Sequence, residues 1–138
     1  MTKVLQLDIV TPSREALSIT CQNVYLPAED GEMGILESHE AYVTLMGTGL
    51  VRIQKADGSQ RLCVRKGFIE VNDENHITLL ADEVKFDHEL ESENLEQRLK
   101  DIEIELQSAK DDPLIQDHLL EEKKWFEVQI ELTLPSKA

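Results

Sequence analysis

The chain has 138 residues, of which 41% are hydrophobic and only 4% are aromatic, so one small domain with an appendage can bury a core that is mainly aliphatic. The formal net charge of −14 argues against binding to nucleic acid, whose phosphates attract Lys and Arg, and against binding to an anionic membrane surface. This acidity favours solubility and basic protein partners.

The negative charge is unevenly distributed along the chain. Residues 1–88 contain 14 acidic and 8 basic groups, whereas residues 89–138 contain 14 acidic and 6 basic groups in far less sequence. The difference predicts two parts, which we place at residues 1–87 and 88–138. The first ten residues lack the features of a signal or transit peptide, and no apolar run reaches 18 residues. We therefore expect a cytosolic protein or one encoded inside an organelle.

Strand patterns begin almost at the first residue. Residues 4–10 alternate between apolar and polar side chains, which is the period of a half-buried strand, and residues 16–20 and 23–26 are again β-like. Cys21 and Cys63 lie within such strand-forming sequence and are too few for a disulfide framework or a metal site. We expect both to be buried structural thiols.

The segment from residue 25 to residue 53 consists of short apolar stretches separated by glycines. Its acidic tip is formed by Glu29, Asp30 and Glu32. Because glycine is favoured where the chain turns tightly, the pattern predicts a strand, an acidic turn, a short strand, a loop around His39 and a further strand.

Two hairpins follow. Residues 51–54 and 61–65 flank Asp57-Gly58, and residues 67–71 and 76–81 flank a polar turn. Eight to ten short strands are predicted in all, which indicates an antiparallel β-sandwich or a flattened barrel.

After residue 90 the apolar period changes to that of a helix. Leu95, Leu99, Ile102 and Leu106 are spaced by 4, 3 and 4 residues, and Ser92 is the expected N-cap.

A second helix is expected to begin at Asp112-Pro113, with Asp as N-cap and Pro at the first helical position. Its expected apolar stripe is Ile115, Leu119, Phe126 and Ile130. The predicted fold class is therefore α+β in two parts, an N-terminal antiparallel β-sandwich followed by a C-terminal antiparallel α-helical hairpin.

An ordered set of motifs in the β-region carries a family resemblance. The set comprises Leu26-Pro27, Gly31-Glu32-Met33-Gly34, His39, Gly49-Leu50-Val51-Arg52-Ile53, Gly67-Phe68-Ile69-Glu70-Val71 and Ile77-Thr78-Leu79-Leu80-Ala81. It resembles the signature of the epsilon subunit of F-type ATP synthases. The C-terminal hairpin is similar to that family in architecture, and residues 130–133 resemble the end of some bacterial members.

The resemblance implies a non-catalytic rotor subunit in the central stalk, which links the gamma subunit to the c ring and couples ion transport to ATP synthesis. It also implies that Glu29, Asp30 and Glu32 face the c ring and that His39 faces gamma. The implied location is peripheral, on the cytoplasmic face of a bacterial inner membrane or on the stromal face of a plastid thylakoid. Contact with the membrane would then be indirect, through the complex.

In the resembled family the hairpin can restrain ATP hydrolysis through transient contacts with the catalytic head subunits. Here Trp125 and Phe126 could supply apolar contacts of that kind, or they could dock the hairpin on the sandwich. The (Ile/Leu)-Asp-x-x-Arg-Ala motif of ATP-binding members is absent, and Arg98 is the only Arg after residue 88, so ATP binding is disfavoured.

Catalytic and metal motifs are missing from the sequence. The four His residues belong to no nucleophile-elbow, phosphate-cradling or metal-ligand motif, and nothing in the spacing supplies catalytic partners for His39. Adjacent carboxylates such as Glu121 and Glu122 would point apart on a helix. We therefore expect no catalytic residue, no cofactor and no metal. The alternative hypothesis is a free-standing β-sandwich adaptor that binds a basic protein. The coupling ion, H⁺ or Na⁺, stays open.

Overall fold

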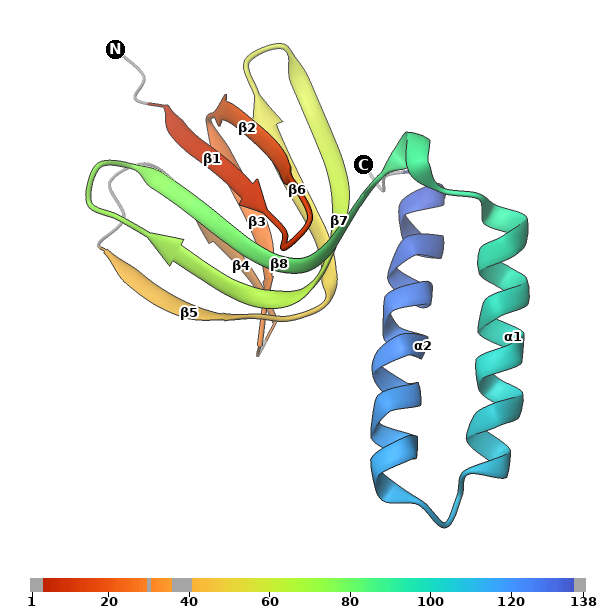
Figure 1. Ribbon diagram of the computed structural model, residues 1–138. Helices are drawn as coiled ribbons and strands as arrows, with labels where there is room; N and C mark the ends of the chain where they lie inside the picture. Colours follow the sequence, from red (N-terminus) through yellow and green to blue (C-terminus); the bar gives the residue numbers. More distant parts are fainter. Residues whose placement is uncertain (1–3, 30, 36–40, 136–138) are drawn as a thin grey trace. The chain divides into compact units, whose positions relative to one another are not determined.

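Alternating apolar and polar side chains in the first part of the chain form strands, and the 3.6-residue period that follows forms helices (Figure 1). The computed structural model describes residues 4–29, 31–35 and 41–135. The chain divides into two compact units, Met1–Lys85 and Phe86–Ala138.

The described residues of the first unit form eight strands. These are β1 (Leu5–Val10), β2 (Glu15–Cys21), β3 (Asn23–Ala28), β4 (Gly31–Ile35), β5 (Tyr42–Met46), β6 (Gly49–Lys55), β7 (Gly58–Val71) and β8 (His76–Phe86). The β-sandwich that the sequence predicts is confirmed. The eight described strands are at the lower end of the eight to ten that the sequence predicts, and the two strands expected at residues 61–65 and 67–71 are one continuous strand, β7.

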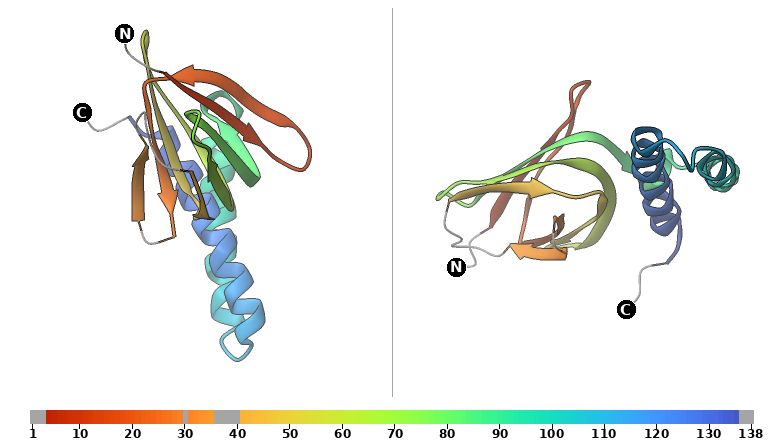
Figure 2. Two further views of the ribbon diagram at one scale, coloured as in Figure 1. Left: turned by 90° about the vertical axis from the view of Figure 1, so that its left-hand side faces the viewer. Right: turned by 90° about the horizontal axis from the view of Figure 1, so that it is seen from below.

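The length of β7 lets it pair with two different neighbours. Residues 58–64 pair with β6, whereas residues 67–71 pair with β5. The sheet has the order β2-β1-β8-β7-β5-β3-β4, and β6 joins β3 to β7. It therefore folds over onto itself into two layers, as both views in Figure 2 show.

One pairing departs from the expected antiparallel pattern. Strands β1 and β8 run parallel, with Leu7 opposite Ile77 and Ile9 opposite Leu79. Parallel neighbours cannot be joined by a tight turn, and β1 and β8 are indeed separated by the whole of the intervening sheet. Local sequence patterns carry no signal for a pairing of this kind.

The core of the sandwich is aliphatic, as the composition predicts. Its fully buried side chains include Leu5, Leu7, Ile9, Val24, Leu26, Ile35, Val51, Ile53, Leu62, Ile69, Ile77 and Leu79. The two thiols, Cys21 and Cys63, are also buried and are not joined by a disulfide. Burial raises the pKa of Cys21 and so favours its unreactive neutral form.

The second unit contains a short 3-10 helix, Asp87–Glu89, and two α-helices, α1 (Ser92–Ser108) and α2 (Pro113–Thr133). Asp112 caps α2 as predicted, since its carboxylate accepts hydrogen bonds from the backbone N–H groups of Leu114 and Ile115. The prediction of Ser92 as N-cap of α1 was wrong by one residue. Glu91 occupies that position, and its side chain accepts from Asn94 instead of capping the backbone.

The apolar stripe of α1 is confirmed, with Leu95 and Ile102 buried. The stripe predicted for α2 is only partly correct. Leu119 is buried, but Ile115 is 51% exposed, and Phe126 and Ile130 are half-buried. The buried side chains toward the end of α2 are Trp125, Val128, Gln129 and Leu132. Both sets follow a helical spacing, so the period alone could not decide which face of α2 is covered.

Candidate interaction surfaces

The acidic turn connects β3 to β4. These strands pair in tight register, with Ala28 opposite Gly31 and Pro27 opposite Glu32. Glu29 is exposed. Asp30, which the sequence groups with Glu29 and Glu32, lies outside the described residues. The turn therefore presents at least one carboxylate, Glu29, to solvent.

Glu32 is paired within its own chain. Nη2 of Arg52 lies 2.8 Å from Oε1 of Glu32, and Nε of Arg52 lies 3.3 Å from Oε2. The guanidinium carbon also lies 4.6 Å from the centroid of the Tyr25 ring. Because both charged side chains are about half exposed, this bidentate pair is worth at most about 1 kcal/mol and can be exchanged for another partner.

The strand register explains how these side chains meet. Tyr25 lies opposite Arg52 across β3 and β6, and opposite Gly34 across β3 and β4. A Cβ at Gly34 would lie 3.0 Å from the Tyr25 ring, so glycine leaves the room that the ring occupies. Sequence reasoning missed the parts played by Tyr25 and Arg52, although the spacing of Gly31 and Gly34 marked the hairpin that brings them to Glu32.

His39, for which the sequence predicts a position facing gamma, lies outside the described residues. The strand that follows it, β5, contributes to an exposed apolar surface that was not predicted. This apolar sheet face consists of Val43 (67% exposed), Leu45 (45%), Phe68 (48%) and Leu80 (44%).

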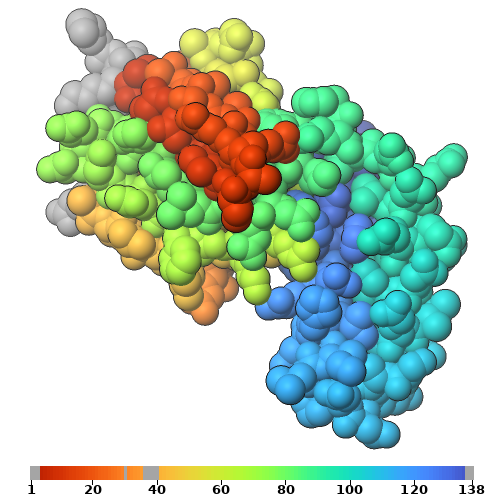
Figure 3. Space-filling model, viewed as in Figure 1, coloured from red at the N-terminus to blue at the C-terminus, as the bar shows by residue number. Residues whose placement is uncertain are grey.

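The four side chains of the apolar sheet face lie on three adjacent strands, β5, β7 and β8. Leu45 and Phe68 are directly opposite each other. In Figure 3 the surfaces of β8, in green, and β5, in orange, lie on the same side of the sandwich. The outward positions of a solvated strand are normally polar, and contiguous exposed apolar side chains mark interaction sites. The signal in the sequence was the presence of apolar residues, such as Val43 and Leu45, at alternate strand positions that face solvent.

A polar cluster occupies the outer side of β2, β1 and β8. Asp8 accepts a hydrogen bond from the Ser18 hydroxyl at 2.6 Å and another from Gln6 at 3.1 Å, and it also contacts His76. The Ser18 hydrogen bond is the largest of the contacts that hold the pKa of Asp8 below its ordinary value. Serine and histidine both bind the carboxylate, so the hydroxyl and the imidazole are not arranged as a nucleophile and its base.

The two aromatic residues predicted as regulatory contacts belong to α2. Trp125 is only 3% exposed. Phe126 is half-buried and lies beneath the guanidinium of Arg98, whose carbon is 5.4 Å from the ring centroid.

In the residues that the structure describes, no three His, Cys, Asp or Glu side chains are grouped as metal ligands. Neither of the long helices, nor the short one, is long and apolar enough to cross a membrane, within the same described residues.

Comparisons with a family model and with individual proteins point to the same family. Residues 4–87 match the family model for the ATP synthase, Delta/Epsilon chain, beta-sandwich domain. The chain is 35% identical over 88 residues to the ATP synthase epsilon chain of Polynucleobacter necessarius, and this match spans 63% of each chain. It is 33% identical over 100 residues to the chloroplastic ATP synthase epsilon chain of Thalassiosira pseudonana, with 72% of each chain covered.

Solved structures share the fold. A chain from the Euglena gracilis mitochondrial ATP synthase, in a structure of OSCP, F1 and c-ring, aligns with a TM-score of 0.79 at 21% identity and covers 90% of this chain and 78% of that one. A chain from the central stalk and c-ring of the Tetrahymena thermophila mitochondrial ATP synthase aligns with a TM-score of 0.62 at 11% identity, covering 96% and 98%. The family match over residues 4–87 agrees with the motifs in the β-region, and the chain belongs to the delta/epsilon family of ATP synthase chains.

Proposed function

We propose that this chain is the epsilon subunit of an F-type ATP synthase, a non-catalytic part of the rotor that links gamma to the c ring. Family membership supports the proposal, as do two solved structures of ATP synthase assemblies with a c-ring, in which a chain has the same fold. The observation that carries it is the apolar sheet face, because a subunit that transmits torque needs a permanent interface.

We assign the apolar sheet face to the gamma subunit. Its side chains lie on β-strands that are hydrogen-bonded to their neighbours, so they form a rigid surface. The acidic turn, with Glu29, Asp30 and Glu32, is assigned to the c ring. Glu32 can exchange Arg52 for a basic group of the ring without leaving Arg52 unsolvated, since both side chains are half exposed. His39 stays assigned to gamma.

The test is co-isolation with the synthase from membranes solubilised in mild detergent. We expect Leu45→Glu and Phe68→Ser to reduce recovery of gamma at least tenfold, because each change removes apolar area from the proposed interface. Val4→Glu is the matched control, since Val4 belongs to the same unit and is 53% exposed but lies before the first strand. Equal recovery of gamma by all three variants would overturn the assignment of the face.

The same experiment separates the proposal from the adaptor hypothesis. Recovery of gamma, the catalytic subunits and the c ring in fixed proportion supports the rotor function. Recovery of a single basic protein without synthase subunits would mean that the chain is an adaptor.

The c-ring assignment is tested separately by Glu32→Gln and Glu29→Gln in the assembled complex. We expect Glu32→Gln to weaken crosslinking between the turn and the ring more than Glu29→Gln does, because Arg52 holds the Glu32 side chain in place before a basic group of the ring replaces Arg52. The reverse order would contradict the assignment.

Regulation by the hairpin is a further part of the proposal. If α1 and α2 restrain hydrolysis, removal of residues 89–138 raises the ATPase activity of the complex. Unchanged activity would show that the hairpin does not inhibit. The proposed location is peripheral to the membrane that holds the complex, and the bacterial relatives favour the cytoplasmic face of a bacterial inner membrane over the thylakoid.

A further inference from the structure

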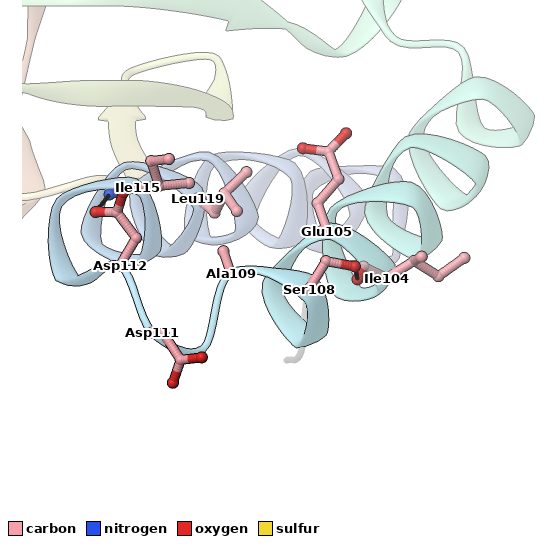
Figure 4. Close-up of a pocket in the computed structure, with 8 residues that line it drawn as sticks. All are labelled: Ile104, Glu105, Ser108, Ala109, Asp111, Asp112, Ile115 and Leu119. Carbon is pink, nitrogen blue, oxygen red and sulfur yellow. Dashed lines mark hydrogen bonds between the residues drawn. The ribbon is translucent and has the colours of Figure 1, made fainter.

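The turn that joins α1 to α2 contains a pocket. Its volume is about 470 Å³. Figure 4 shows side chains from both helices and from the turn around it. The lining residues are Ile104, Glu105, Ser108, Ala109, Asp111, Asp112, Ile115 and Leu119. We call this site the hairpin-tip pocket.

The pocket has an apolar floor. Leu119 is buried at its base, whereas Ile104 is 65% exposed and Ile115 is 51% exposed. Leu114, which directly precedes Ile115, is 82% exposed. One exposed aliphatic residue needs no explanation, but a group of them around a hollow marks a surface that another molecule covers.

The rim of the pocket is strongly acidic. Three of its lining residues, Glu105, Asp111 and Asp112, carry carboxylates, and none of its lining residues is basic. Among the described residues neither Glu105 nor Asp111 takes part in an ion pair. Both carboxylates are therefore available to a positively charged partner.

The helix dipoles add to this negative field. The last turn of α1 has no basic residue, so no side chain of that turn offsets the negative end of the helix dipole. The positive end of the α2 dipole is already occupied, because Asp112 accepts the N–H groups of Leu114 and Ile115 (the bond to Ile115 is dashed in Figure 4). A cation at the tip would be stabilised by the rim and by the end of α1.

We propose that the hairpin-tip pocket binds a basic amphipathic helix of a partner protein. One aliphatic side chain of that helix enters the pocket beside Ile115 and Leu119 (Figure 4), and a Lys or Arg one turn away pairs with Glu105. The carboxylates of the pocket favour a partner segment with basic side chains, and the exposed aliphatic side chains favour one that also has an apolar face. The binding does not depend on the epsilon function, because it uses residues of the second unit alone.

The test uses the full chain, labelled with ¹⁵N, and a synthetic 14-residue helical peptide built from Lys, Leu and Ala with one apolar face. We expect saturable shifts in the amide signals of Ser108, Ala109 and Ile115, and an affinity that falls as salt is raised. Two comparison peptides have Glu in place of Lys, or the same residues in scrambled order. Equal binding of either one, or shifts confined to other regions, would overturn the proposal.

Variants of the protein locate the contact. Glu105→Gln is expected to weaken binding about threefold to fivefold at low salt, as for a surface ion pair. Ile115→Ser should weaken it about tenfold, through loss of apolar contact. The matched controls are Glu127→Gln and Leu120→Ser, which change exposed residues of α2 outside the pocket.

Glu105→Gln changes only an exposed side chain and therefore remains informative if Ile115→Ser disturbs the hairpin. An unchanged affinity for Glu105→Gln would overturn the proposal. So would equally tight binding of the single amino acid arginine at the same amides, because the pocket would then be a site for a small cation.

Discussion

Gly67 lies where β7 leaves β6 and begins to pair with β5. A Cβ at this position would lie 1.7 Å from the carbonyl oxygen of Leu80, which belongs to the backbone of the neighbouring strand. The backbones of β7 and β8 thus approach more closely than any side chain allows. This contact occurs at the bend that lets one strand serve both layers.

We expect Gly67→Ala to lower the free energy of unfolding by at least about 2 kcal/mol, since a backbone atom must move to relieve the clash. Gly47→Ala is the control, because a Cβ there would lie 3.3 Å from the nearest atom, the carbonyl oxygen of Ala28. Urea unfolding of the two variants measures the difference. Equal stability of both would contradict the close approach at Gly67.

Asp8 makes the stability of the sandwich depend on pH. Hydrogen bonds from Ser18, followed by smaller effects of His76 and Gln6, lower the pKa of Asp8 in the folded protein. The folded-state pKa is therefore below that of the unfolded chain, which is about 3.9. The ionised carboxylate stabilises the fold above that value, and its contribution is lost as the pH falls through the folded-state pKa.

Asp8→Asn should consequently cost about 1 kcal/mol of unfolding free energy at pH 7 and progressively less below pH of about 4. Unfolding curves of the wild type and the variant between pH 7 and pH 2 measure this. Asp57→Asn, in the exposed turn between β6 and β7, is the control and should show no such dependence. A constant difference between wild type and Asp8→Asn at all pH values would contradict the prediction.

At the scale of elements, the two helices differ in how they begin. Asp112 satisfies two N–H groups at the start of α2, and Pro113 fixes the first helical residue. The first turn of α1 has no such side-chain cap, since Glu91 bonds to Asn94. We therefore expect the start of α2 to open less readily than the start of α1.

Asp112→Ala should destabilise the hairpin by about 1 kcal/mol. Amide hydrogen exchange would detect this as faster exchange in the first two turns of α2, at residues 116–120. The neighbouring Asp111→Ala removes a carboxylate that does not cap the helix and should leave that exchange nearly unchanged. Equal acceleration by both variants would show that charge, and not capping, is responsible.

At the scale of the whole molecule, the two units have different means of stabilisation. The sandwich has a continuous ladder of paired strands over a core of fully buried aliphatic side chains. The described helices bury fewer side chains, and residues 89–138 have a net charge of −8 against −6 for residues 1–88. The sandwich is therefore the more rigid of the two parts, and the helical part is the more acidic.

We expect residues 1–87 to fold without the hairpin, because the strand pairings of the sandwich involve only strands of that segment. Circular dichroism should show a β-rich spectrum with a cooperative thermal transition. An unfolded spectrum for the shortened chain, when the full chain is folded under the same conditions, would contradict this expectation.

The sequence by itself determined the elements and the family. Alternation and turn residues identified the β6–β7 hairpin, Asp112-Pro113 identified the start of α2, and the motifs between residues 26 and 81 identified the family. These signals are local, because period, capping and turn chemistry act over a few residues.

Only the tertiary structure decided which side chains meet. The parallel pairing of β1 with β8, the contact of Gly67 with Leu80, and the pairing of Glu32 with Arg52 over Tyr25 join residues from different strands. The alternation of one strand shows which residues share a face, but it does not show which strand lies beside it. For that physical reason the apolar sheet face and the hairpin-tip pocket emerge only when the neighbouring strands and helices are in place.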